Sequence, residues 1–170
     1  RVWIRMKKII SGILTLFLLS SCGIYSFTGA SIPSDAETIS VEHFKITAIN
    51  SPPSLSQTIT EGLKDLILSQ TQLDLIEQNG DLSFRGKITK YSITPMAIQA
   101  NESAGQNRLT IEIEIVYSNS FHEQQNFESI FSRYRDFNSS ENLTDIESVL
   151  IEEITEELLE DIFNKAFVNW

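Results

Sequence analysis

Two stretches of the chain carry apolar residues at the three- and four-residue spacing of an amphipathic helix. The first follows Pro52-Pro53, with Ser54 as its expected N-cap. Its apolar positions are Leu55, Ile59, Leu63, Leu66 and Ile67. The second begins at Ser140 and runs to the end of the chain. Its stripe consists of Leu143, Ile146, Leu150, Ile154, Leu158, Ile162 and Ala166, widened by Val149, Ile151, Leu159, Phe163 and Phe167. Because its other side is acidic, we expect packing, and not electrostatics, to hold its C-terminal half.

Other stretches have the two-residue period of β-strands. The clearest is Arg108 to Ser118, where an apolar residue occupies every second position from Leu109 to Tyr117 and polar residues alternate with them. This alternation predicts an antiparallel strand with one buried and one wet face. A further strand is expected around Phe127 to Phe137. The polar segment from Met96 to Asn107 has no period and predicts an exposed loop.

The stretch from Thr38 to Ile46 is β-branched but irregular. Ile39 and Val41 share one face, whereas Phe44 and Ile46 fall on the other. This switch indicates either burial on both faces or a bulge, and we favour a strand covered at least partly on both faces.

A β-hairpin is predicted at Asn79-Gly80, because both residues tolerate a positive φ angle. It would join a strand containing Leu73 and Leu75 to one running from Leu82 to Thr89.

The order of these elements predicts an α+β fold. We expect a two-layer sandwich in which two amphipathic helices pack on one face of a mixed, largely antiparallel sheet of four to five strands.

The N-terminal stretch has the features of an export signal. Met6-Lys7-Lys8 precedes an apolar run that is too short to span a bilayer, and Leu19-Ser20-Ser21-Cys22 resembles a bacterial lipobox. We expect residues 1–21 to be a signal peptide, with 1–5 upstream of the true start, and Cys22 to be the lipid anchor. Residues 22–37 would form a lipidated tether and 38–170 a single domain. A plain signal peptide with a chance cysteine is the alternative.

Charge and composition exclude several classes of function. The chain has 13 basic and 23 acidic residues. Removal of the signal peptide leaves nine basic residues and a net charge of −14, which argues against nucleic-acid binding through net charge. The two histidines, His43 and His122, form no metal motif, and the glycines form no phosphate loop. We therefore expect no enzyme activity, no metal and no cofactor.

The few basic residues of the domain are candidate binding residues. Arg85 and Lys87 share one face of their strand, while Lys90 should point the other way. Arg133 and Arg135 project together, and neighbouring strands would place all four in a cationic strip for phosphates or carboxylates. The alternative is that these cations pair with Glu112 and Glu114 across the sheet.

Short segments spread along the chain carry a family resemblance. They are Cys22-Gly23-Ile24-Tyr25-Ser26-Phe27-Thr28-Gly29, Pro53-Ser54-Leu55-Ser56-Gln57-Thr58, Asn79-Gly80-Asp81-Leu82, Asn107-Arg108-Leu109-Thr110 and Glu160-Asp161-Ile162-Phe163-Asn164. In their order, from Cys22 to Trp170, the chain resembles the LptE family of lipopolysaccharide-assembly lipoproteins in its Bacteroidetes-type version.

The resemblance implies a lipoprotein at the inner leaflet of the outer membrane that plugs an LptD-type β-barrel and aids lipopolysaccharide insertion. It implies the barrel as partner, and lipopolysaccharide as a further one. The candidate ligand- or partner-binding residues are Arg85, Lys87, Arg108, Arg133 and Arg135. The alternative function is a stand-alone, periplasm-facing lipoprotein that binds an acidic glycolipid or sugar.

Overall fold

Two helices and six strands make up the part of the chain that the computed structural model describes, residues 35–96 and 105–168. In chain order the elements are β1 (Thr38–Val41), β2 (Lys45–Ile46), α2 (Ser54–Gln70), β3 (Asp74–Ile76), β4 (Leu82–Met96), β5 (Gln106–Asn119), the 3₁₀ turn η1 (Glu123–Gln125), β6 (Phe127–Asn138) and α3 (Leu143–Phe167). The predicted signal peptide, the Cys22 anchor, the tether up to residue 34 and positions 97–104 of the predicted loop lie outside the described residues.

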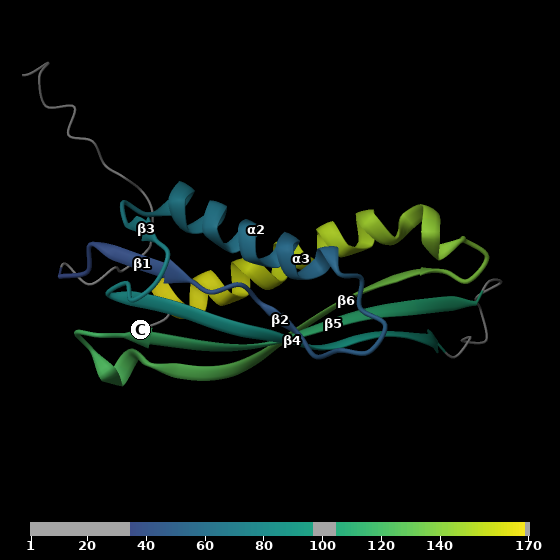
Figure 1. Ribbon diagram of the computed structural model, residues 1–170. Helices are drawn as coiled ribbons and strands as arrows, with labels where there is room; N and C mark the ends of the chain where they lie inside the picture. The colour runs from purple at the N-terminus through teal and green to yellow at the C-terminus, as the bar shows by residue number, and fades with distance from the viewer. Residues whose placement is uncertain (1–34, 97–104, 169–170) are drawn as a thin grey trace, which may run out of the picture.

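The strands form one mixed sheet in the order β3-β1-β4-β5-β6, with β2 paired to β4 beyond the end of β1. β1 is parallel to both β3 and β4, and β4, β5 and β6 form an antiparallel meander. Figure 1 shows both helices on the same side of this sheet, α3 along its length and α2 over one half. The predicted two-layer α+β sandwich is confirmed.

The predicted hairpin at Asn79-Gly80 is wrong. β3 and β4 do not pair with each other, because β1 lies between them and is parallel to both. Asn79 adopts a positive φ of 59°, as predicted, whereas Gly80 does not have a positive φ. The turn connects β3 to β4 on the other side of β1, so it does not join two strands that pair with each other.

The predicted strand 38–46 is interrupted after Val41, and both of its pieces pair with β4. Val41 lies opposite Phe84 and Lys45 opposite Lys87, so four steps along one strand match three along the other. This one-residue offset places Phe44 in the core directly over Gly86, where a Cβ atom would lie 2.4 Å from its ring. The expected coverage holds for β1, whose residues from Ile39 to Val41 are all buried, and the extra residue explains the change of face.

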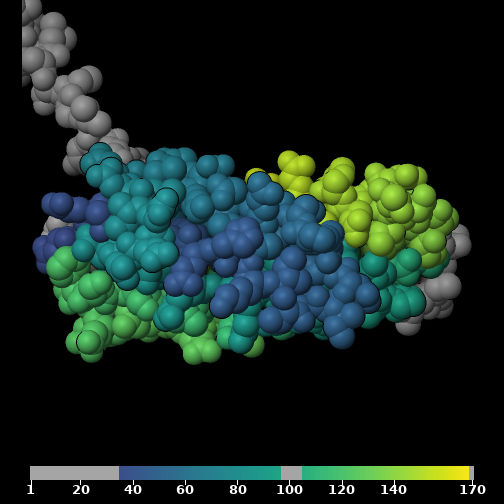
Figure 2. Space-filling view, in the orientation of Figure 1, coloured from purple at the N-terminus to yellow at the C-terminus, as the bar shows by residue number. Residues whose placement is uncertain are grey.

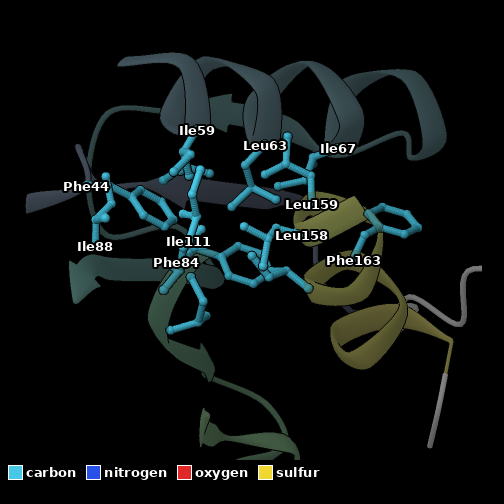
Figure 3. Close-up of a cluster of buried hydrophobic side chains, with 14 of the residues drawn as sticks. Phe44, Ile59, Leu63, Ile67, Phe84, Ile88, Ile111, Leu158, Leu159 and Phe163 are labelled. Atoms are coloured by element: carbon cyan, nitrogen blue, oxygen red, sulfur yellow. The ribbon is translucent and has the colours of Figure 1, made fainter. Parts of the chain in front are cut away.

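The core fills the space between the helices and the sheet. Figure 3 shows Ile59 and Leu63 of α2 and Leu158 of α3 directed toward strand residues such as Phe84 and Ile111. Leu159 of α3 packs against α2, next to Gly62, and the Phe163 ring points away from the strands. The alternation predicted for β5 is confirmed, since Leu109, Ile111, Ile113, Ile115 and Tyr117 are all buried.

Two details of the helices differ from the prediction. Val149 is 53% exposed and does not widen the buried stripe of α3. Ser54 is the first residue of α2, after Pro53 at the N-cap position, and no side chain caps this end.

Figure 2 shows the start of α3 in yellow-green at one end of the molecule, beyond the segment that leads into α2. Among residues 35–96 and 105–168, no helix combines the length and hydrophobicity that a membrane span requires.

Candidate functional site

The five candidate basic residues lie on opposite faces of the sheet. We call the side under the helices the covered face and the other side the open face. Arg133 and Arg135 lie opposite Ile111 and Leu109 of β5 and therefore share the covered face. The remaining three lie on the open face: Arg85, Lys87 and Arg108. The predicted strip of four cations does not form, because β5 separates β4 from β6 and the two pairs face opposite ways.

Arg133 and Arg135 are bound by acidic residues of α3. Arg135 donates through Nε to Glu153 (2.8 Å) and through Nη2 to Glu157 (2.6 Å). Arg133 forms a two-pronged ion pair with Asp161, with donor–acceptor distances of 2.7 and 2.8 Å. These contacts raise the pKa of both guanidinium groups and lower that of Glu157. The predicted pairing with Glu112 and Glu114 is therefore wrong for these two arginines, which attach α3 to the edge of the sheet.

Arg108 is also engaged by its neighbours, although it lies on the open face. Its Nε and Nη2 donate to the two carboxylate oxygens of Asp136, directly opposite on β6, at 2.7 and 2.8 Å. Its guanidinium carbon lies 3.6 Å from the centroid of the Tyr134 ring. This ion pair lowers the pKa of Asp136, and it leaves Arg108 less free to bind a ligand than an unpaired cation would be.

The cations nearest to one another on the open face are Lys45, Arg85 and Lys87. Lys87 forms an ion pair with Glu114 at 2.8 Å, as the cross-strand alternative predicted, and this contact raises the pKa of Lys87. Arg85 is 56% exposed and reaches Glu42 only at 4.0 Å. Lys45 stands directly opposite Lys87 in the parallel pairing of β2 with β4. Like charges in this position are unfavourable unless an anion lies nearby.

Lys90 extends this group, contrary to the prediction that it points to the other face. The pairing of β4 with β5 shifts between Ile88 and Lys90, so that Lys87 lies opposite Glu114 and Lys90 opposite Glu112. Since Glu112 and Glu114 share a face, Lys87 and Lys90 share it too. A bulge at Thr89 therefore lengthens the stripe from two residues to three.

A cleft of about 420 Å³ runs through this group on the open face. Its walls carry Lys45, Arg85, Lys87 and His43 on the basic side, and Glu42, Glu114 and Glu128 on the acidic side. The site is thus a groove with three cations and three carboxylates, in which most charged groups are accessible to a ligand of comparable size.

Hydrogen bonds to α2 fix the segment that borders the cleft. Ser56 Oγ donates to the Phe44 carbonyl and lies 2.9 Å from His43 Nε2, while the Phe44 N–H donates to Thr60 Oγ1 at 3.1 Å. Because the single hydroxyl proton of Ser56 goes to the carbonyl, His43 Nε2 must be the donor in the second contact. Among the described residues, no group of three or more His, Cys, Asp or Glu side chains could hold a metal ion.

Two basic residues of the open face were not among the candidates from the sequence: Lys45, which lines the cleft, and Lys90, which does not. A signal for Lys90 was present: Ile88 and Tyr91 are both apolar but three residues apart, and only a bulge lets both face the core. For Arg133 and Arg135 the signal was the two-residue period of the strand. Both are separated by an even number of positions from Phe127, Phe131 and Phe137, so they lie on the same face as these apolar residues. Lys45 could be placed only once the offset between β2 and β4 was known.

Solved structures with a similar arrangement include a lipoprotein. The chain is similar to a minor lipoprotein from Acinetobacter baumannii, with 12% identity, a TM-score of 0.50 and coverage of 76% of this chain and 91% of the other. Protein CT253 from Chlamydia trachomatis gives 9% identity, a TM-score of 0.52 and coverage of 79% and 99%. A homologue of neuraminyllactose-binding haemagglutinin from Helicobacter pylori gives 8%, 0.56 and coverage of 83% and 88%. At these identities the similarity shows the fold alone.

Sequence comparison gives the family. No curated protein matches the chain significantly. The model of the LptE family, described as lipopolysaccharide-assembly, matches residues 36–166, which is most of the chain and includes nearly all of the described elements. The chain therefore belongs to the LptE family, the lipopolysaccharide-assembly lipoproteins of the cell envelope.

Proposed function

We propose that this chain is the lipoprotein subunit that assembles with, and plugs, an LptD-type β-barrel translocon in the outer membrane. In this role it aids the insertion of lipopolysaccharide and is held at the periplasmic face by lipid on Cys22, while residues 38–170 act as one domain. The observation that carries the proposal is the family match over residues 36–166. The lipobox-like sequence before Cys22 supports the anchor.

The architecture suits a binding subunit. Its helices bury one face of the sheet in a continuous core, and the opposite face of β4, β5 and β6 has no covering element within the described residues. A plug must keep its shape while it contacts a partner, and a well-packed core provides that rigidity. The family description is one of assembly and names no reaction.

Co-purification tests this proposal directly. A tagged full-length chain, expressed in its native host and extracted with detergent from the outer membrane, should bring a large β-barrel with it. The matched control is Cys22→Ala, which keeps the domain but loses the attachment site for lipid, and should reduce the recovered barrel. Recovery of a folded, lipidated chain without any barrel would contradict the proposal.

A second candidate function is the binding of an acidic glycolipid or sugar on the open face. The specific observation in its favour is Lys45 placed directly opposite Lys87 beside Arg85, in a cleft of about 420 Å³. Lys87 already has Glu114 as its partner at 2.8 Å. A phosphate or carboxylate in the cleft would add charge-assisted contacts to Lys45 and Arg85. Arg133 and Arg135 do not belong to this candidate site, because acidic residues of α3 already bind them on the covered face.

The test is lipopolysaccharide binding by the purified chain and by the Lys45→Ala/Arg85→Ala variant. We expect the double variant to bind at least about tenfold more weakly, since two charge-assisted contacts are lost. The matched control is Arg133→Ala/Arg135→Ala, which removes the same charge from the covered face and should leave binding unchanged. Equal binding by all three proteins would remove this candidate.

A further inference from the structure

The outer edge of β6 differs from the other strand edges of the described chain. β3 has three residues and β2 two, and β4 beyond Ile88 contains Pro95. β6 has 12 residues, contains no Gly, Pro or Lys, and pairs with β5 without any shift of register. Short strands, prolines, bulges and charged side chains, lysines above all, are the usual means of protecting an edge from unwanted pairing. Of these means, β6 has only charged side chains, Glu128, Arg133, Arg135 and Asp136. Three of the four are held in ion pairs within the described part of the fold.

The register shows which backbone groups of β6 are free. The N–H of Ser139 donates to the carbonyl of Gly105 at 2.9 Å, which continues the ladder in which Gln106 lies opposite Asn138. Because bonded and non-bonded pairs alternate in an antiparallel ladder, the even-numbered residues of β6 turn their N–H and C=O groups away from β5. Three of these groups have local partners: Asn138 N–H donates to the Glu141 carboxylate, Asn138 C=O accepts from the Glu141 N–H, and Tyr134 C=O accepts from Arg135.

The side chains of these even-numbered residues lie on the open face. Ile130 and Tyr134 are 62% and 49% exposed, respectively. An added strand would therefore gain main-chain hydrogen bonds together with apolar contacts at alternate positions, which is how β-augmentation achieves affinity and specificity. Arg133 does not block its approach, because Asp161 of α3 holds its guanidinium group. Arg135 occupies the outward carbonyl of Tyr134, so the groups left for an added strand are those of Glu128, Ile130, Ser132 and Asp136 and the N–H of Tyr134.

A second copy of this chain does not fit the edge. If β6 paired in antiparallel fashion with β6 of a second copy, even-numbered residues would lie opposite even-numbered residues, because their N–H and C=O groups point outward. Two registers of this kind give the longest overlap. One, centred on Ser132, places Glu128 opposite Asp136 twice, and the other, centred on Arg133, places that arginine opposite itself. Like charges in such pairs are destabilising, and each chain carries a net charge of −10. A second copy is therefore a poor match for this edge.

Charge defines the chemistry of a matching occupant. Acidic side chains border the edge on both faces of the sheet: Glu128 and Asp136 on the open side, and Glu153, Glu157 and Asp161 on the helix side. Within residues 35–96 and 105–168, four basic side chains lie near these five acids. They are Arg108, Arg133, Arg135 and Lys165, whose Nζ lies 5.1 Å from the centroid of the Phe127 ring. An extended segment with a central apolar residue for Ile130 and basic residues on its flanks is therefore complementary.

We propose that the outer edge of β6 binds such a segment of the barrel subunit as an added β-strand. This inference rests on the proposed function. Strands of a closed barrel have no free edge, so the segment must be a loop or a terminal extension of the barrel protein.

Proline at Ser132 tests the edge directly. Ser132 directs its N–H outward, so Ser132→Pro removes a donor for the added strand while the bonds between β5 and β6 remain. We expect at least a tenfold loss of barrel co-purified with the full-length lipidated chain. Ser132→Ala, which keeps the N–H, should recover as much barrel as the wild type. Undiminished recovery with Ser132→Pro would overturn the inference.

Photo-crosslinking gives a second test that does not depend on how the proline variant folds. A p-benzoylphenylalanine in place of Ile130 should crosslink to a loop or extension of the barrel protein, identified by peptide mass spectrometry. A crosslink to a second copy, to residues 22–34 of the same chain, or to nothing in a preparation that contains barrel would refute the edge site alone. Absence of barrel from the wild-type preparation would refute the proposed function as well.

Discussion

The two faces of the sheet use the same types of residue for different purposes. On the covered face, Arg133 and Arg135 are bound by carboxylates of α3 and contribute to the attachment of the helix. On the open face, Lys45 and Arg85 stand beside Lys87 with fewer and longer contacts. A basic residue thus indicates a binding site only where the fold leaves its charge unsatisfied. This difference separates the residues that build the domain from those that are available to a ligand or partner.

The largest expected difference between the faces concerns apolar side chains of β5. Ile113 is fully buried on the covered face, so Ile113→Ala should lower the free energy of unfolding by about 2–5 kcal/mol through lost burial and a cavity. Val116 points to the open face, and Val116→Ala should cost less than about 1 kcal/mol. Urea unfolding of the detergent-solubilised full chain measures both. Equal losses would contradict the assignment of faces.

A smaller effect is expected where the chain crosses from β1 to β2. A Cβ atom on Gly86 would lie 2.4 and 2.8 Å from two atoms of the Phe44 ring, so Gly86→Ala should cost about 1–3 kcal/mol. Phe44→Leu replaces the ring by a smaller side chain and should relieve this clash. The double variant should therefore lose less stability than the sum of the losses in the two single variants. Additive losses in a double-mutant cycle would show that the two residues are not in contact.

Removal of Arg135 from the covered face should have a modest effect on stability. Arg135→Ala breaks contacts to Glu153 and Glu157 that are largely accessible to solvent, and we expect the melting temperature to fall by roughly 2–4 °C. Arg85→Ala on the open face should change it by less than about 1 °C, because its contact at 4.0 Å is weak. A larger effect of Arg85→Ala would reverse the comparison.

The smallest effect concerns acid. Hydrogen bonds from the Thr38 hydroxyl and from the N–H groups of Thr38 and Glu37 lower the pKa of Asp81, and Arg135 lowers that of Glu157. A carboxylate with a lower pKa in the folded than in the unfolded state stabilises the fold above its unfolded pKa. The contribution of these two carboxylates should therefore be fully present above about pH 5 and should decrease as the pH falls through their folded pKa values. Glu157→Gln should flatten this decrease, and an unchanged pH profile would argue against the ion pair.

Local pattern predicted much of the fold because much of it is locally determined. The period of β5 and the apolar rows of α2 and α3 follow directly from which residues are buried. The position of β1 between β3 and β4 could not be predicted this way. It depends on parallel pairing across distant parts of the chain, whereas the Asn79-Gly80 signal concerns only the local turn.

The candidate site could be predicted only in part, because it too depends on contacts between distant parts of the chain. Arg85 and Lys87 share a face as the alternation indicates, but Lys90 joins them through a bulge and Lys45 through the offset of β2. Whether an arginine is free depends on what packs above it, and the acids that bind Arg133 and Arg135 lie at least 18 residues away in the chain. Sequence alone gave these acids only as a solvated helix face.

Hydrogen exchange of the chain, free and in complex with the barrel, tests the central claim most directly. The account predicts slower exchange on binding for the outward amides of β6, from Glu128 to Asp136, while the buried turns of α3 stay as protected as before. Slower exchange confined to the helices, with β6 unchanged, would contradict it.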